Sequence, residues 1–243
     1  MPVHSEMVTI GAPRSAAQRW STASLVAIPI RTRLIRSGDQ IAELTAQATL
    51  GIAGPNDVIA VAETAVAIAQ GRAIAAETIR PSRLAYALSR RAGALATINQ
   101  PESLQLVIDQ VGSFRVLYAA AMHVLGRLRG RRGVFYEILG EAIATIDGYT
   151  GTLPPFERTI VLGPQDPDRV AQAIAQRTGA HAVVVDANDL GIAKVLGASH
   201  GVRRARVEEA LVHNPQGNGD EQTPLVVLKW RGTGEHPLLE RPV

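Results

Sequence analysis

The order of hydrophobic and polar positions predicts strands and helices that alternate irregularly along the chain. Short apolar runs rich in β-branched residues predict buried strands, at 24–31, 58–62, 159–162, 182–186 and 225–230. Apolar positions at helical spacing predict helices, at 39–50, 81–91, 101–111, 114–128, 167–177 and 203–212. Two more short strands are predicted on either side of Gly140, at 134–139 and 141–146.

Local signals refine these boundaries and indicate two lobes. Asp39 and Asp166 are expected to cap the helices that follow them, because a short carboxylate can accept from the first free backbone N–H groups. The helical block that begins at Pro81 differs in texture from both ends of the chain. A mixed α+β or α/β fold with two lobes fits this pattern better than a simple doubly wound sheet. Residues 1–23 are expected to form a flexible arm and 232–243 a loose tail.

Composition limits the classes of protein that need be considered. The chain is 46% hydrophobic and 19% charged, which is typical of a globular protein. It contains no cysteine, which suits a reducing cytoplasm. No apolar run reaches the roughly 18 residues of a membrane span. A net charge of only +3 with 4% aromatic residues does not favour nucleic-acid binding, although 127–133 is locally rich in arginine.

The candidate chemistry lies in carboxylates that follow apolar runs. Asp147 follows one such run, and Asp186, Asn188 and Asp189 follow Val183-Val184-Val185. Carboxylate and amide oxygens are the ligands that Mg²⁺ and Mn²⁺ prefer. The alternative is that each Asp only caps a turn or a helix. Walker, dinucleotide-binding, zincin and nucleophile-elbow motifs are absent, and the six histidines are scattered.

Several short motifs stand in an order that resembles one enzyme family. They run from 28–30 and 57–59, through 146–147 and 162–168, to 182–186 and 212–218. The segment 162–168 reads Leu-Gly-Pro-Gln-Asp-Pro-Asp, which is similar to the family's Leu-Leu-Pro-Glu-Asp-Pro-Asp. Together they resemble the ligases that add γ-linked glutamate to the deazaflavin coenzyme F-420.

This resemblance implies an architecture and a metal site. The N- and C-terminal segments are expected to share one lobe, formed by 24–80 with 201–231 on the nucleotide side. Residues 81–200 would form the other lobe, on the metal and substrate side. Asp147 and Asp186 would hold Mg²⁺ or Mn²⁺, assisted by Asn188 or Asp189.

The resemblance also implies partners. GTP, or another nucleotide, would be a cosubstrate, an acidic small molecule would be the acceptor, and the chain would form a homodimer. The implied nucleotide-contacting positions are Pro29, Ile30, Arg31, Glu63, Thr64, Thr150, Asn214, Gln216, Gly217 and Asn218.

The departures from the family concern its phosphate-binding cations. Where the family carries Ser-Lys twice after the second strand, this chain reads Glu63-Thr64 and Ala67-Ile68. After the strand-end Asp the family has a hydroxyl residue, and here Ala187 stands. Arginines could substitute for the missing lysines, the candidates being Arg31, Arg33, Arg72 and the stretch 127–132.

Two functions of different classes follow from this sequence. The first is a nucleotide- and metal-dependent amide ligase that adds glutamate or a similar amino acid to an acidic small molecule. The second is a relative without ligase activity that binds a small anionic ligand or a protein. The aspartates favour the first function, and the altered phosphate positions favour the second.

Overall fold

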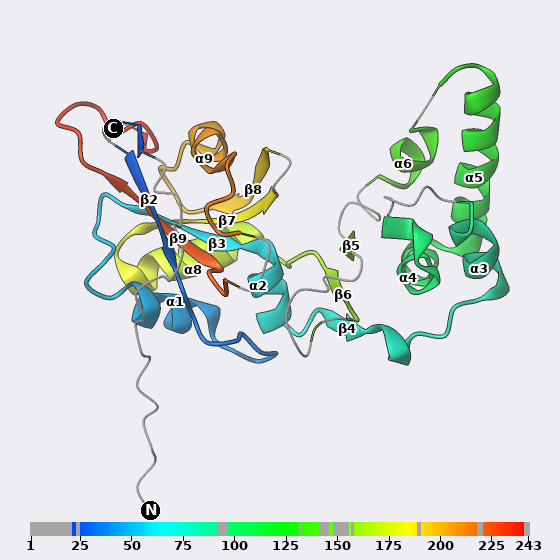
Figure 1. Cartoon of the computed structure of the whole chain (residues 1–243), viewed down its shortest axis with the longest axis horizontal. Coiled ribbons are helices and arrows are strands. Elements are labelled where there is room, and N and C mark those ends of the chain that lie inside the picture. The colour runs from blue at the N-terminus through cyan, green and yellow to red at the C-terminus, as the bar shows by residue number, and fades with distance from the viewer. Residues whose placement is uncertain are drawn as a thin grey trace, which may run out of the picture. The chain divides into compact units, whose positions relative to one another are not determined.

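The computed structural model describes residues 21–22, 25–91, 97–131, 133–140, 146–147, 156, 158–188, 191–217 and 221–240. The chain divides into two units, Met1–Gly71 with Pro164–Val243, and Arg72–Gly163. Figure 1 shows the elements of both units.

Unit 1 is built on a six-stranded mixed sheet with the strand order β1-β2-β9-β3-β7-β8. Its strands are β1 (Ser21–Thr22), β2 (Leu25–Ile30), β3 (Val58–Ala62), β7 (His181–Asn188), β8 (Ile192–Ala198) and β9 (Leu225–Trp230). Its helices are α1 (Ile41–Thr49), α2 (Glu63–Ala69), α8 (Pro167–Thr178) and α9 (Arg204–Leu211). β3 and β7 are parallel, and the other neighbouring pairs are antiparallel.

The sheet of unit 1 is covered by helices on both faces. On one face, Val58, Ala60, Val183 and Val185 pack with the apolar side of α9. On the other face, residues that alternate with these pack with α1, α2 and α8. Burial on both faces explains why β3 and β7 read as continuous apolar runs instead of alternating ones.

Unit 2 combines a small sheet with a group of helices. The three-stranded antiparallel sheet has the order β4-β6-β5, formed by β4 (Ala73–Ala75), β6 (Thr159–Leu162) and β5 (Ile146–Asp147). The α-helices are α3 (Arg83–Ser89), α4 (Pro101–Val111), α5 (Ser113–Leu128) and α6 (Val134–Leu139), with 3₁₀ turns at Ala76–Thr78 and Thr97–Asn99. Leu104, Val107, Val116 and Phe135 lie in their shared core.

The predicted mixed α+β class is confirmed, and so is the sharing of one lobe by the two ends of the chain. β2 and β3 both pair with β9, so the N-terminal and C-terminal segments form one sheet. The strong strand and helix patterns are recovered to within a few residues.

Several features of the fold differ from the predictions. Residues 134–139 form helix α6, because Phe135 and Leu139 share a face at helical spacing and are buried there; residues 141–145 lie outside the described part. Strand β8 was not predicted at all. The predicted lobe of 81–200 is too long, since β7 pairs with β3 and places 164–200 in unit 1.

The predicted loose tail and flexible arm are also corrected in part. Val202 pairs with Leu239 in a β-bridge, Leu238 is buried, and Arg203 forms an ion pair with Glu235. Residues 235–240 are therefore packed on unit 1. At the other end, Ser21–Thr22 pairs with β2, and residues 1–20 and 23–24 lie outside the described part.

Neither predicted aspartate cap forms. Helix α1 begins after Gln40, and the Asp39 carboxylate accepts instead from Arg33 and from the backbone of Arg36. Asp166 stands at the start of α8 in the left-handed region, with φ of 46°, and makes no side-chain cap. Among the described helices, none is long and apolar enough to cross a membrane.

Candidate functional site

The strand register of unit 1 brings most of the predicted site residues to one edge of the sheet. β2 ends at Ile30, opposite Leu225, and Leu225 is also opposite Val61. β3 ends at Ala62, opposite Val185 of the parallel strand β7. β2 and β3 therefore end together and are followed by Arg31 and Glu63, while β7 continues beyond them through Asp186 to Asn188, paired with β8. Ligands of α/β folds commonly bind beyond the carboxyl ends of such strands.

The loop before β9 is fastened to the same edge. The backbone N–H of Ala62 donates to Pro224 O at 2.8 Å, and the Gln216 amide donates to the same carbonyl at 2.9 Å. The Thr223 hydroxyl donates to Gln216 O at 2.5 Å. Gln216 and Asn214 are buried, so these predicted nucleotide-binding side chains pack inside the loop, while Asn218 lies outside the described residues. Gln216 therefore positions the loop beside the strand ends.

Asp186 stands opposite Lys194 across the β7–β8 hairpin. By the alternation of a strand, Asp186 lies on the same face as Val184, which is the face covered by α2 and α8. Burial by the surrounding protein raises the pKa of Asp186, although its side chain is still exposed, and the positive charge of Lys194 partly offsets this effect. Within the described part of the chain, the Lys194 ammonium makes no hydrogen bond.

Lys194 is a feature of the site that the sequence analysis missed. It is one of only two lysines in the chain, and it lies on strand β8, which was not predicted. A signal was present, because Gly191 separates the apolar run of β7 from the apolar run of 192–198, as in a hairpin.

The structure places the other predicted metal ligands in different parts of the chain, and not all of their side chains are described. Asn188 ends β7, and its side-chain oxygen accepts from Ile192 N at 3.3 Å, which closes the hairpin. Asp147 ends strand β5 of unit 2, but its side chain is outside the described residues, as are Asp189 and Thr150. The shared metal site therefore stays a prediction.

The donor chemistry of Asp186 fits a hard divalent cation, since carboxylate oxygens are its usual ligands. However, the described residues contain no group of three or more His, Asp or Glu side chains that could hold a metal. A complete metal site at Asp186 would need further oxygen donors from outside that set.

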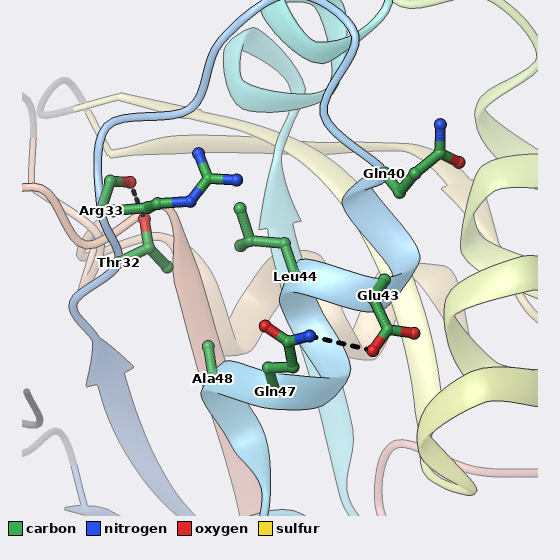
Figure 2. A pocket seen from close by; sticks show the side chains of 7 residues that line it. All are labelled: Thr32, Arg33, Gln40, Glu43, Leu44, Gln47 and Ala48. Atoms are coloured by element: carbon green, nitrogen blue, oxygen red, sulfur yellow. Dashed lines mark hydrogen bonds between the residues drawn. The ribbon is translucent and has the colours of Figure 1, made fainter. Parts of the chain in front are cut away.

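A small hollow lies beside the segment that leaves β2. It has a volume of about 150 Å³ and is lined by that segment and by α1, through Thr32, Arg33, Gln40, Glu43, Leu44, Gln47 and Ala48. Figure 2 shows Leu44 and Ala48 on the helix side and Thr32 and Arg33 on the opposite side. The hollow is too small for a whole nucleotide.

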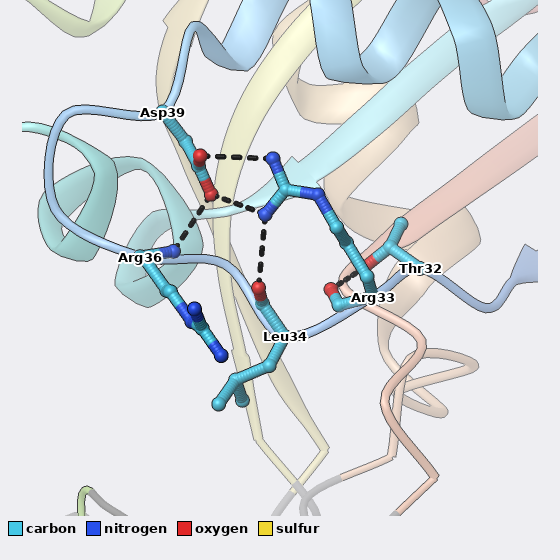
Figure 3. A network of polar contacts seen from close by, with 5 residues as sticks. All are labelled: Thr32, Arg33, Leu34, Arg36 and Asp39. Carbon is cyan, nitrogen blue, oxygen red and sulfur yellow. Dashed lines mark hydrogen bonds and ion pairs between the residues drawn. The ribbon is translucent and has the colours of Figure 1, made fainter. Parts of the chain in front are cut away.

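The guanidinium of Arg33 is already used within the protein. It forms a two-pronged ion pair with Asp39, at 2.7 and 2.8 Å, and also donates to Leu34 O (Figure 3). The Asp39 carboxylate accepts in addition from Arg36 N at 2.8 Å. The hydrogen bond from Arg33 lowers the pKa of Asp39. This network fixes the segment between β2 and α1, so Arg33 is a weak candidate for replacing a phosphate-binding lysine.

The remaining arginine candidates fall into two groups. Arg72 donates to Gly163 O at 2.6 Å, and Arg131 pairs with Glu137, so both have partners inside unit 2. Arg31 is exposed directly after β2, and no described residue forms a hydrogen bond or ion pair with it. Among the described residues at the carboxyl edge of the sheet, Arg31 and Lys194 therefore have the capacity to bind an anion.

The two pairs of positions on helix α2 where the family carries Ser-Lys differ in burial. Glu63 and Thr64 are half-buried at its first turn, next to the strand ends. Ala67 and Ile68 are buried in the core. The position where the family carries its second lysine is therefore an apolar packing position in this chain.

Comparison with known proteins places the chain in a family. A family model described as F420-0:Gamma-glutamyl ligase matches residues 29–189, and the chain belongs to that family. A coenzyme F420:L-glutamate ligase from Methanopyrus kandleri is 29% identical over 157 residues. That alignment covers 64% of this chain and 54% of the relative, so the chain spans about half the length of that protein.

Proposed function

We propose that the protein is a GTP- and divalent-metal-dependent amide ligase that adds glutamate or a similar amino acid to an acidic small molecule. It would act in the cytoplasm as a homodimer. Membership of the γ-glutamyl ligase family supports the reaction class. The observation that carries the proposal is the strand register, which brings Arg31, Glu63, Asp186 and the 214–217 loop to one edge of the sheet.

The proposed reaction has two steps. A carboxylate oxygen of the acceptor attacks the γ-phosphorus of GTP, which forms an acyl phosphate and releases GDP. The amine of glutamate then attacks the acyl carbon, an amide forms, and inorganic phosphate leaves with the loss of a proton from nitrogen. The protein mainly positions these groups and balances their charge.

The residues of this chain would divide that work. Lys194 and Arg31 would face the phosphates, because they are the cations at the edge with no competing hydrogen bonds in the described part. Gln216 would hold the loop that borders the nucleotide. Mg²⁺ or Mn²⁺, held by Asp186 with Asp147 and Asp189, would neutralise phosphate charge.

The direct test is an assay of the purified full chain with GTP, Mn²⁺, glutamate and a panel of acidic small molecules that includes the deazaflavin coenzyme lacking glutamate. Mass spectrometry should detect an acceptor heavier by one glutamyl residue, together with release of phosphate. Lys194→Gln should reduce that rate at least tenfold, because a charge beside the phosphates is worth about 1.4 kcal/mol or more. Arg206→Gln, which removes an exposed arginine from α9, is the matched control and should leave the rate unchanged.

The second candidate function is binding without catalysis, to a small anionic ligand or a protein. The observation that favours it is the buried Ile68 at a position where the family has a lysine. In that case no acceptor would be glutamylated, and the product would be absent at every nucleotide tested. An anionic ligand would still raise the melting temperature, because ligands that bind only the native state stabilise it.

A further inference from the structure

Strand β8 has one residue more than the segment of β7 with which it pairs. Gly197 lies opposite Val184, but the next residue of β7, Val185, lies opposite Val195. Leu196 is therefore the extra residue of a β-bulge, and the register shift falls between Val184 and Val185. Bulges often lie at sheet edges beside functional sites, where they redirect a side chain.

The bulge decides which face of the sheet Lys194 occupies. Directly opposite residues of antiparallel strands share a face, so Lys194 lies on the face of Asp186, which is covered by α2 and α8. If pairing continued from Gly197 without the extra residue, Lys194 would stand opposite Ala187, on the face covered by α9. The single inserted residue therefore brings the lysine to the same side of the sheet as Asp186.

The half of β8 that follows the bulge is fixed by α8. A Cβ atom at Gly197 would lie 2.1 Å from the carbonyl carbon of Pro167, so only glycine fits at this position. The Asp168 carboxylate accepts from Ala198 N at 2.8 Å and also forms an ion pair with Arg204. These contacts set the register on one side of the bulge.

The half of β8 that contains Lys194 is held by Glu208 of helix α9. The Glu208 carboxylate accepts from Val195 N at 2.9 Å, and α9 packs against the strand (Figure 1). Among the described strands, β8 is the last of its sheet, so an N–H on its outer side needs a partner that is not a strand. Val195 is buried, and leaving its N–H unpaired would therefore be costly.

We infer that Glu208 is a positioning residue of the proposed ligase, because it holds the bulge that turns Lys194 toward the nucleotide phosphates. The role of Lys194 rests on the proposed function, whereas the register of β8 does not. Glu208 acts on Lys194 through the backbone of Val195, by a hydrogen bond that its negative charge strengthens. Without that bond, residues 192–195 would be free to leave the register that sets Lys194 opposite Asp186.

Amide–amide nuclear Overhauser effects of the isotope-labelled full chain report the register directly. The N–H of Val195 points outward, so Lys194 and Asp186 form the adjacent hydrogen-bonded pair, in which the two amide protons face each other. Their cross-peak should be present in the unmodified chain and in Glu208→Gln, whose amide oxygen can still accept. It should be lost in Glu208→Ala. A cross-peak of unchanged intensity in Glu208→Ala would overturn the inference.

Calorimetry with GTP and Mn²⁺ measures the consequence for ligand binding. Glu208→Ala and Lys194→Gln should each weaken GTP binding about tenfold, and the double variant should bind no more weakly than either, because both changes remove the same contact. Glu208→Gln should bind GTP normally. The matched control is Glu209→Ala on the same helix, which removes an exposed carboxylate paired with Arg206 and should also bind normally.

The two measurements distinguish failure of this inference from failure of the proposed function. Unchanged GTP binding by Lys194→Gln would contradict the proposed function at Lys194, while the cross-peak would still report whether Glu208 holds the register. Weak binding by Lys194→Gln with normal binding by Glu208→Ala would show that Lys194 acts without Glu208 and would overturn the inference. Additive losses in the double variant would overturn it as well.

Discussion

The two ends of the unit 1 sheet carry the same pair of residue types in opposite states. At the amino end of β3, Asp57 is buried and pairs with Lys229 at 3.2 Å. Asp57 also accepts from Gly54 N, and Lys229 donates to Ile52 O, so both charges are fully engaged. At the carboxyl end of the adjacent strand β7, Asp186 is exposed and stands opposite Lys194 without an ion pair.

This difference indicates that Asp57 and Lys229 are structural, whereas Asp186 and Lys194 are available to bind a ligand. The ion pair between the buried Asp57 and the partly buried Lys229 fixes the turn before β3, and its hydrogen bonds leave no capacity to bind a ligand. The exposed Asp186 and Lys194 form no ion pair with each other, and they lie beside the ends of β2 and β3 and the loop before β9. We call the end of the sheet with Asp57 and Lys229 the closed end, and the end with Asp186 and Lys194 the open end.

The largest effect is expected at the closed end. Lys229→Met should lower the free energy of unfolding by about 3 kcal/mol, because it leaves the buried Asp57 carboxylate without its partner. Lys194→Met should change stability by no more than about 0.5 kcal/mol, since its surroundings are exposed. Urea denaturation of both variants measures the contrast. Equal losses at the two ends would show that Lys194 is also structural.

A smaller effect is expected from placing a lysine in helix α2. Ile68→Lys should destabilise the protein by about 2 kcal/mol, because an ammonium would replace a buried apolar group. Thr64→Lys, one turn earlier and half-buried at the strand ends, should fold normally and tighten GTP binding in calorimetry. Tighter GTP binding by Ile68→Lys than by Thr64→Lys would indicate that the phosphates bind near residue 68 and not at the strand ends.

The smallest effect is expected in the segment that leaves the open end. Asp39→Asn should lower the free energy of unfolding at pH 7 by about 1 kcal/mol, because the charged hydrogen bonds to Arg33 are lost. The pKa of Asp39 is lowered in the folded state, so its stabilisation is present above the unfolded value of 3.8 and is lost as the pH falls further. The two proteins should therefore converge in stability at low pH. A difference that is constant with pH would contradict this.

Much of the fold was predictable because its signals are local. The valine run of β7 and the helical spacing of 101–111 and 114–128 act within single elements, and the structure confirms them. Residues 134–139 form a helix and not the predicted strand, because a short segment with five apolar or aromatic residues out of six suits either element until tertiary packing decides. The position of 164–200 depended on pairing between β3 and β7, which are more than one hundred residues apart.

The candidate site was predictable only in part, because some of its residues depend on pairing and packing between distant segments. Arg31, Glu63 and Asp186 could be proposed because each follows a recognisable strand. Lys194 was missed although Gly191 indicates a hairpin, because its place opposite Asp186 depends on the register of that hairpin. The ion pair between Arg33 and Asp39 and the burial of Ile68 also depend on tertiary packing, and no short motif encodes them.

Hydrogen–deuterium exchange of the full chain, with and without GTP and Mn²⁺, tests most directly whether the open end of the sheet is the ligand site. The amides of 30–33, 62–66, 185–188 and 213–217 should exchange more slowly when both ligands are present. The amides of 52–58 and 228–230, at the closed end, should be unchanged and serve as the internal reference. Protection confined to the closed end, or no protection at any of these segments at saturating ligand, would contradict the assignment.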